Sequence, residues 1–230
     1  MKRILFFLLM FFCAVPAFAM KTVSVRSLFL SLPDSIFTRH AQCFHANDSF
    51  PLAERNILLN RYDSALNSFS SESGIRFWIS SCSDSLQRIS FTSGETSVTL
   101  SVIQQNGKEI FFCLLARECD FVTCDDNWDF YTLKKGKLAE VEHVFPAGVS
   151  AGLFFDTAYL VQMGFDPSMP LDGMEINFTG NPSVFLLTIN TEFFDPELFG
   201  EENPMTKLDP EKMKRTELVL KLKGKEFVME

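Results

Sequence analysis

The chain lacks the short motifs that mark most catalytic and nucleotide-binding sites. It contains no G-x-S-x-G motif, no glycine-rich phosphate loop and no C-x-x-C pair. Histidine is scarce, with three residues in 230, and no cluster of Lys and Arg provides a phosphate-binding patch. These absences disfavour serine hydrolases, nucleotide-binding proteins and nucleic-acid partners. We therefore assign no catalytic residue, no metal ligand and no cofactor.

Beyond its N-terminus the chain also lacks an apolar run long enough to span a bilayer, which takes about 20 residues. At the N-terminus, Lys2-Arg3 precede the apolar stretch from Ile4 to Val15, and Ala17-Phe18-Ala19 fits a small-x-small cleavage site. We predict that residues 1–19 are a cleaved signal peptide. The mature chain is then exported and has no transmembrane segment.

Cysteine is too rare for a fold held by disulfides, and 26 phenylalanines supply a core instead. Five of the six cysteines remain after cleavage, and an odd number in an exported protein leaves at least one free thiol or an intermolecular bond. Cys119 and Cys124 flank a turn, so we predict a disulfide between them. Cys43 and Cys82 are the second candidate pair. Cys113 lies on an apolar strand, where a thiol behaves as a small hydrophobe.

The chain is organised around a hairpin within residues 96–133. Alternation of side chains over residues 98–103 indicates a half-buried strand. Asn106-Gly107 then predicts a tight turn in which both residues have positive φ. With these two residues as the loop, Leu100 faces Cys113 on a wholly apolar face of the hairpin. We therefore expect a hairpin that lies in the core.

Helical patterns occur on both sides of this hairpin. One main helix follows Pro51, a residue that suits the first helical position. The other spans Ser150 to Met163 and ends at a glycine. A shorter helix within residues 25–37 is limited to about two turns by Pro33.

Strand patterns fill much of the remaining chain. The predicted strands outside the central hairpin are residues 75–79, 87–92, 121–133 and 138–144. A closing hairpin with Lys223-Gly224 as its loop places Leu220 opposite Phe227. We predict an α+β fold, mostly an antiparallel β-sheet meander with two main helices.

Two segments of the chain are similar to each other. Residues 89–103 and 176–189 share Ile, Phe, Thr, Ser, Val, Leu and Ile with one gap, and each follows an amphipathic helix. The similarity suggests two similar halves, each a helix followed by a β-hairpin. The halves are residues 20–145 and 146–230, which either stand apart or form one compact domain.

One polar loop carries residues that bind metals or act as nucleophiles. His40, Cys43 and His45 form an H-x2-C-x-H pattern, and imidazole and thiolate both bind zinc. Structural zinc sites usually have four ligands, and the remaining histidine, His143, is far along the chain. A thiol-dependent enzyme would need an exposed, activated thiolate beside a histidine. Metal binding and thiol catalysis at this loop are therefore alternatives to a non-catalytic protein.

Acidic residues cluster around the turn between the two paired cysteines. Asp120, Asp125, Asp126 and Asp129 could supply carboxylate oxygens to calcium. The spacing lacks the D-x-[DN]-x-[DN]-G pattern, however, and Asp favours turns for its own backbone hydrogen bonds. A solvated turn is the favoured interpretation.

Phe193, Phe194 and Phe199 are candidates for a hydrophobic binding surface. They lie in or beside residues 193–210, an acidic segment with three prolines that we predict to be a long loop. Large exposed apolar patches usually bind partners. We expect most other phenylalanines in the core.

Several dispersed segments carry a recognisable pattern. They are LFLSLPDSI at 28–36, NRYDSA at 60–65, the central hairpin with its cysteine-bearing turn, DNWDFYTL at 126–133 and the closing hairpin. Together they resemble a family of exported proteins of unknown function from Bacteroides-type bacteria. The resemblance implies export in a Gram-negative bacterium and an α+β fold, and it supplies no functional residue.

The sequence favours an exported, non-catalytic protein that binds a partner protein or an envelope ligand in the periplasm or at the cell surface. The predicted export, the large hydrophobic core and the absence of residues spaced as in catalytic motifs support this interpretation. One alternative is a thiol-dependent enzyme or a metal-binding protein that uses His40, Cys43 and His45. Another is a purely structural envelope component.

Overall fold

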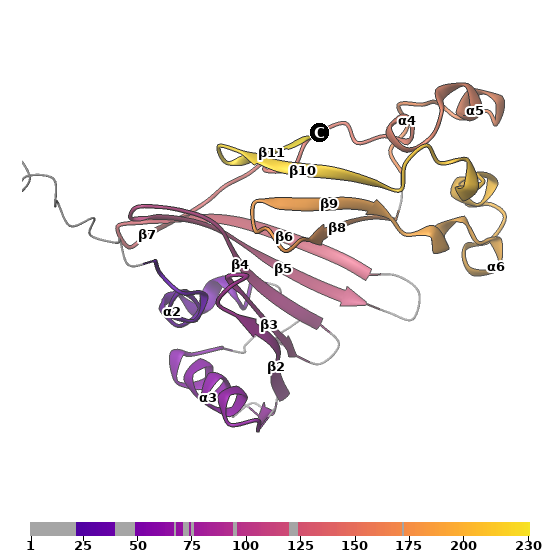
Figure 1. The fold of residues 1–230 in the computed structure, drawn as a ribbon. Helices are drawn as coiled ribbons and strands as arrows, with labels where there is room; N and C mark the ends of the chain where they lie inside the picture. The colour runs from indigo at the N-terminus through magenta and orange to yellow at the C-terminus, as the bar shows by residue number, and fades with distance from the viewer. Residues whose placement is uncertain are drawn as a thin grey trace, which may run out of the picture.

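The protein is built from three layers. The computed structural model describes residues 22–39, 49–66, 68–70, 74, 76–93, 96–119, 124–171 and 173–230. Two helices, α2 (Val25–Ser31) and α3 (Leu52–Asp63), cover one face of a seven-stranded sheet, and a four-stranded sheet covers the other face (Figure 1). The predicted α+β class is confirmed.

The seven-stranded sheet is an antiparallel meander in which each strand pairs with the next one along the chain. Its strands are β1 (Phe69–Ser70), β2 (Arg76–Ser83), β3 (Arg88–Ser93), β4 (Thr96–Asn106), β5 (Glu109–Cys119), β6 (Cys124–Lys134) and β7 (Lys137–Glu140). Consecutive strands are separated by few residues in the chain, and neighbouring antiparallel strands need only such short connections. The predicted antiparallel meander is confirmed.

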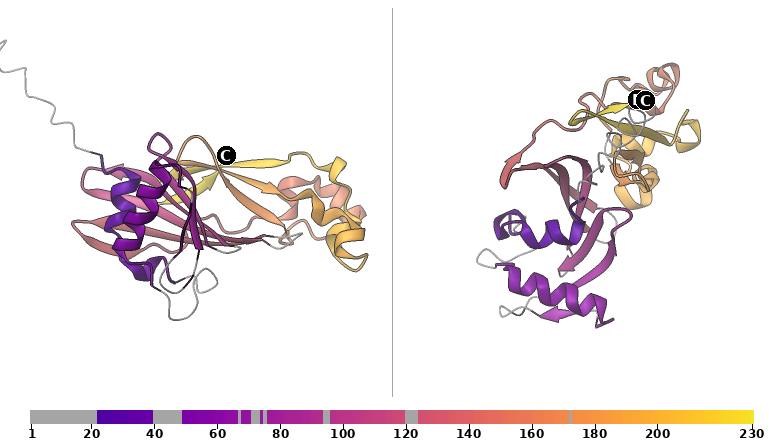
Figure 2. Two further views of the ribbon diagram at one scale, coloured as in Figure 1. Left: turned by 90° about the horizontal axis from the view of Figure 1, so that it is seen from below. Right: turned by 60° about the vertical axis from the view of Figure 1, so that its left-hand side comes forward.

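The second sheet is also antiparallel, with the strand order β11-β10-β9-β8. Its strands are β8 (Met174–Phe178), β9 (Val184–Ile189), β10 (Glu217–Lys223) and β11 (Glu226–Met229). The short helices α4 (Ala151–Phe154) and α5 (Thr157–Gln162) precede it, and α6 (Pro196–Phe199) lies between β9 and β10. Figure 2 shows these three helices at the opposite end of the molecule from α2 and α3.

The register of the central hairpin differs from the predicted one. The loop is Gly107-Lys108, and only Gly107 has a positive φ, 61°, which matches a turn with glycine at its first central position. Ile103 is a bulge, at which the register shifts once between Val102 and Gln104. Leu100 therefore faces Leu114, and Cys113 lies on the other face of the sheet. The prediction that Cys113 shares a face with Leu100 was wrong, although its thiol is buried.

The closing hairpin shows the same one-residue difference. Its loop is Gly224-Lys225, and φ of Gly224 is 72°. Leu222 therefore faces Phe227, and Leu220 faces Met229 rather than the predicted Phe227. In both hairpins glycine occupies the first loop position. The predictions placed glycine at the second position, and the predicted registers were therefore wrong.

Apolar side chains fill the space on both faces of the seven-stranded sheet. Between this sheet and the helices, the Phe50 ring packs 5.9 Å from Phe29 and 5.3 Å from Phe91, measured between ring centroids. Between the two sheets, a second cluster includes Phe185. The Ser183 hydroxyl donates to the carbonyl oxygen of the bulged Ile103 at 3.1 Å, so a polar contact also joins the sheets.

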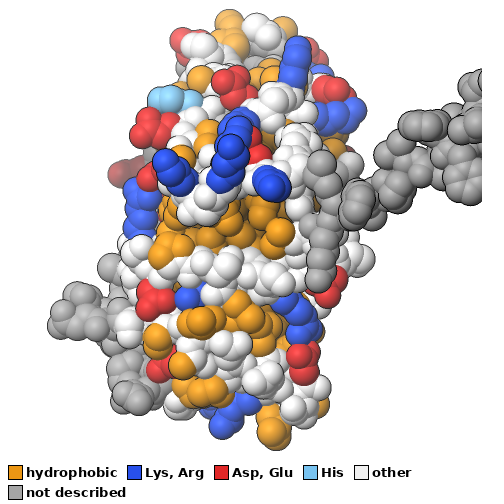
Figure 3. Space-filling model, turned by 90° about the vertical axis from the view of Figure 1, so that its left-hand side faces the viewer, with side chains coloured by type: hydrophobic (Ala, Val, Ile, Leu, Met, Phe, Trp, Pro, Cys, Tyr) orange, Lys and Arg blue, Asp and Glu red, His pale blue; other side chains and the backbone are white. Residues whose placement is uncertain are grey.

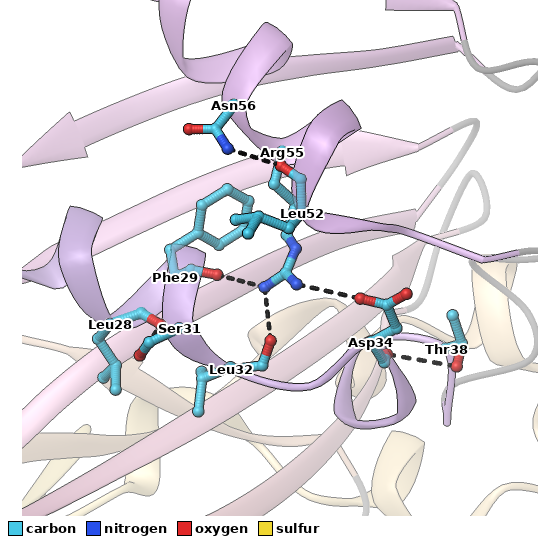
Figure 4. A network of polar contacts seen from close by, with 9 residues as sticks. All are labelled: Leu28, Phe29, Ser31, Leu32, Asp34, Thr38, Leu52, Arg55 and Asn56. Carbon is cyan, nitrogen blue, oxygen red and sulfur yellow. Dashed lines mark hydrogen bonds and ion pairs between the residues drawn. The ribbon is translucent and has the colours of Figure 1, made fainter. Parts of the chain in front are cut away.

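A buried arginine joins α2 to α3. Pro33 ends α2 as predicted, which leaves carbonyl oxygens at its C-terminal end without helical donors. Arg55 of α3, which is 2% exposed, donates from Nη1 to the Phe29 and Leu32 carbonyl oxygens at 2.5 and 2.8 Å. Its Nη2 donates to Asp34 at 3.0 Å (Figure 4). The guanidinium replaces the donors that a further helical turn would supply.

The predicted helix from Ser150 to Met163 is divided into α4 and α5. Phe155 separates them in an extended conformation, with φ −112° and ψ 159°. Its buried ring lies 5.9 Å from Phe194, and its backbone forms an isolated bridge with Met213. Burial of this aromatic side chain against the C-terminal segment therefore interrupts a pattern that favours one helix. The second predicted main helix was wrong in length.

Residues 193–210, predicted as a long loop, contain short helical segments. Besides α6, these are the 3-10 helices η2 (Thr191–Phe194), η3 (Pro204–Lys207) and η4 (Pro210–Lys212). Each begins after an Asn or Asp side chain that accepts a hydrogen bond from a backbone N–H: Asn190, Asp195, Asn203 and Asp209. Three of the segments begin with proline, which has no N–H to satisfy. These Asx–Pro pairs explain the ordered turns.

Candidate functional site

A groove opens where the chain leaves the seven-stranded sheet. The Val141 N–H donates to the Phe130 carbonyl oxygen at 2.8 Å and extends the pairing of β7 with β6. His143, with φ 55°, then turns the chain away, and the Val144 carbonyl oxygen accepts from the Phe227 N–H of β11 at 2.7 Å. The groove, about 410 Å³ in volume, lies between residues 128–130 of β6 and residues 140–145. Its volume falls in the range of small-ligand sites.

Aromatic rings form one wall of the groove. Trp128 of β6 is half-buried, and its ring centroid lies 5.4 Å from Phe145 in an edge-to-face arrangement. The same indole lies 5.2 Å from Phe178 and 5.5 Å from Phe185 of the four-stranded sheet. Phe130 of β6 stacks with the indole, with ring centroids 6.0 Å apart. Rings from both sheets therefore hold Trp128 in place, so its exposed part is a pre-formed apolar contact surface.

Carboxylates also line the groove. Asp129, Glu140 and Glu142 line it, and Arg39 donates to Glu140 at 2.7 Å. The Tyr131 hydroxyl donates to Asp129 at 3.2 Å, and burial raises the pKa of Tyr131 to about 12. The tyrosine is therefore neutral and keeps its proton for Asp129. Glu140 is thus paired with a guanidinium, whereas the Glu142 side chain is exposed to solvent.

The disulfide predicted between Cys119 and Cys124 is present, and it joins the ends of β5 and β6. Cys43, with His40 and His45, lies outside the described residues, so the metal or thiol site predicted there stays a prediction. Cys82 is a half-buried free thiol.

The described free thiols are not activated. Burial raises the pKa of Cys82, and complete burial raises the pKa of Cys113 strongly. A catalytic thiol needs the opposite shift, because the thiolate is the nucleophile. These two cysteines therefore give no support to the thiol-dependent enzyme.

The three phenylalanines of the predicted binding surface occupy different environments. Phe194 is buried and packs against Phe155, so it belongs to the core. Phe193 and Phe199 are half-buried and stack with ring centroids 4.3 Å apart. Phe193 also covers Gly173, where a Cβ would lie 2.4 Å from its ring. The pair is largely occupied by contacts within the chain, and its role in binding stays a prediction.

Among the described residues, no group of three or more His, Cys, Asp or Glu side chains is arranged to hold a metal ion. Asp126 of the predicted acidic cluster instead accepts from Arg117 through both carboxylate oxygens, at 2.6 and 2.7 Å. This bidentate pair crosses from β6 to β5 and stabilises the ladder. Asp120 lies outside the described residues.

Basic side chains gather at one end of the molecule, where three hairpin turns meet (Figure 3). The turns β4–β5, β6–β7 and β10–β11 carry Lys108, Lys134, Lys135, Lys137, Lys223 and Lys225. Glu109 accepts from Lys134 at 2.8 Å and lies 2.7 Å from Lys225, so it links the two sheets. These hydrogen bonds, that of Lys134 first, lower the pKa of Glu109 to about 2.

Glu109→Gln is expected to destabilise the protein at neutral pH but not at strongly acidic pH. Because the folded pKa of about 2 lies below the unfolded value of roughly 4.3, the ion pairs stabilise the fold above the unfolded pKa. That contribution disappears as the pH falls through about 2. Urea unfolding of the wild type and the variant, from neutral to strongly acidic pH, measures the difference in their free energies of unfolding. Glu201→Gln, in an exposed turn, is the control, and a pH-independent difference for Glu109→Gln would contradict the assignment.

Sequence reasoning missed the groove. The sequence patterns predict strands at 121–133 and 138–144 and an acidic cluster that includes Asp129, but they did not identify Trp128 or Glu142 as candidate site residues. A useful signal was a tryptophan in an acidic segment, because ligand sites combine aromatic side chains with a few polar groups. The sequence does not predict that the chain turns away from the seven-stranded sheet at His143, because a positive φ is uncommon for residues other than glycine.

Comparisons with known proteins support the fold. No protein-family model matches the chain, and no curated protein matches it. The structure is similar to that of a domain of an uncharacterized protein from Porphyromonas gingivalis W83, with 17% sequence identity and a TM-score of 0.55. The match covers 91% of this chain and 99% of that chain. At this identity the likeness shows a shared fold alone, found in a protein of the Bacteroidetes.

Proposed function

We propose that this is a non-catalytic exported protein that binds a partner protein or an envelope ligand in the groove beside Trp128. The observation that carries the proposal is the half-buried indole, held by rings of both sheets in a groove that three carboxylates also line. An apolar surface with a few convergent polar groups is the usual composition of a ligand site. The raised thiol pKa values of Cys82 and Cys113 favour binding over thiol chemistry.

Two features of the chain support export. The first 19 residues have the pattern of a signal peptide, and the Cys119–Cys124 disulfide suits an oxidising compartment. None of the helices in the described ranges has the length and apolar character needed to cross a membrane. We infer a location in the periplasm or at the cell surface of a Gram-negative bacterium.

Origin and domain organisation are part of the same proposal. The Porphyromonas gingivalis neighbour supports the resemblance to exported Bacteroides-type proteins. Residues 89–103 and 176–189 each span an antiparallel pair, β3 with β4 and β8 with β9. This likeness supports two related halves, 20–145 and 146–230.

A fluorescence screen tests the proposed site. In a Trp78→Phe variant, Trp128 is the remaining tryptophan, so its emission reports the groove. The probes are short peptides, oligosaccharides and phospholipid vesicles of defined composition. We expect one class to change Trp128 emission saturably, and Glu142→Arg to weaken that binding, because Glu142 lines the groove.

The matched control is Trp128→Phe, which retains Trp78 of β2. Its emission should not respond to the probe. Equal responses from both tryptophans, no response to any class, or conversion of a probe to product would contradict the proposal.

A further inference from the structure

We propose that the edge of β6 from Cys124 to Asp129, along which no described strand pairs, binds an extended basic peptide, which joins the seven-stranded sheet as an additional strand. The inference rests on the proposed binding function of the groove and names its ligand class. β6 pairs with β5 from Cys124 to Lys134, but β7 pairs with it only from Tyr131 onward. The part of β6 before Phe130 therefore borders the groove without a neighbouring strand among the described residues.

Backbone groups on this part of β6 are directed toward the groove. In an antiparallel ladder, successive residues direct their N–H and C=O groups to opposite sides. The Phe130 carbonyl oxygen accepts from Val141 on the β7 side. Trp128 and Asp126, two and four residues earlier, therefore direct their backbone groups to the same side, beyond the end of β7. These groups match the donors and acceptors of an incoming strand.

Side chains on the two faces of this edge specify the ligand. Trp128 and Phe130 belong to the cluster between the sheets, whereas Tyr131 belongs to the cluster on the helix side and donates to Asp129. An added strand would meet aromatic rings on one face and carboxylates on the other. A peptide in which Lys or Arg alternates with apolar residues satisfies both faces, because strand side chains alternate with a period of two.

Charge favours a basic peptide over a second copy of this chain. The exposed carboxylates of Asp125 and Glu142 flank this edge, whereas Glu140 pairs with Arg39. Two copies paired along this edge would bring these carboxylates together. Acidic side chains protect edge strands from such self-pairing, and the net charge of −8 adds repulsion. A basic strand neutralises the same groups.

Two short capped peptides test the ligand class, one alternating Lys with Val and the other alternating Glu with Val. Each is titrated against the whole protein while Trp128 emission is recorded in the Trp78→Phe variant. We expect saturable binding of the Lys–Val peptide that weakens with added salt, since salt screens exposed charges. The Glu–Val peptide should not bind.

N-methylation of the Lys–Val peptide backbone tests whether the peptide binds as a β-strand. N-methylation of all Lys residues blocks one edge of the peptide, and N-methylation of all Val residues blocks the other. One pattern should weaken binding by about tenfold or more, because at least two backbone hydrogen bonds are lost. The other pattern should leave the affinity within about twofold. Equal tolerance of both patterns would overturn strand addition.

Paired charge reversals test the position. Asp125→Lys combined with Glu142→Lys should weaken the Lys–Val peptide by about tenfold or more. Glu201→Lys combined with Glu202→Lys makes the same change of net charge in an exposed turn after α6 and should have little effect. Equal loss in both double variants would overturn the assignment to this edge.

The outcomes separate this inference from the function on which it rests. If oligosaccharides or vesicles change Trp128 emission but no peptide does, the inference fails and the proposed binding function stands. If no probe changes Trp128 emission, both fail.

Discussion

Replacing Arg55 with alanine is expected to lower the free energy of unfolding by about 2–6 kcal/mol. The guanidinium is 2% exposed and donates to the carbonyl oxygens of Phe29 and Leu32 and to Asp34. Its removal leaves two carbonyl oxygens at the end of α2 without their donor, and each such group costs about 1–3 kcal/mol. The guanidinium carbon also lies 5.1 Å from the Phe37 ring centroid, a cation–π contact that is lost. Urea unfolding followed by circular dichroism measures the loss.

The matched control is Arg26→Ala. Arg26 lies on α2 and pairs with Asp63 at 2.8 Å, but the two side chains are 30% and 52% exposed. An exposed pair of this kind contributes at most about 1 kcal/mol. Arg55→Lys should fall between the two variants, because an ammonium cannot reproduce the planar fork of donors. An Arg55→Ala variant as stable as Arg26→Ala would show that the buried network does not stabilise the fold.

Replacing Phe185 with alanine is the second change with a large expected effect, a loss of about 3–5 kcal/mol in unfolding free energy. Phe185 of β9 is fully buried, and its ring centroid lies 4.6 Å from Phe227 and 5.5 Å from Trp128. The substitution leaves a cavity between the two sheets. Because that core belongs to both sheets, we expect their unfolding transitions to shift together.

Each tryptophan serves as a separate probe of this transition. Trp78 of β2 reports the seven-stranded sheet far from the groove, and Trp128 reports the core between the sheets. Phe185→Ala is combined with the loss of one tryptophan or the other, so that each variant retains a single probe. Both probes should report the same lowered urea midpoint. Leu198→Ala, at a side chain that is 51% exposed, should change stability by less than about 0.5 kcal/mol. A shift at Trp128 alone would show that the four-stranded sheet unfolds separately.

The predicted and observed hairpins show where sequence patterns become insufficient. Alternation over residues 98–103 correctly indicates a strand, and the glycines correctly mark the turns. The pattern does not specify whether Gly107 is the first or second loop residue, since both turn types accept glycine. The pattern does not predict the bulge at Ile103 either. Apolar residues lie on both faces of β4, so a register shifted by one residue buries equally hydrophobic side chains.

The sequence by itself determined the strand content, the turn positions, the end of α2 at Pro33 and the disulfide between Cys119 and Cys124. Each depends on short-range geometry, such as side-chain periodicity, the fixed φ of proline or the closeness of two cysteines across a turn. Only the tertiary structure decided the strand register, the face on which Cys113 lies, and the groove between residues 128–130 and 140–145. These depend on packing between segments distant in the chain: Val144 bonds to β11, and rings of both sheets hold Trp128.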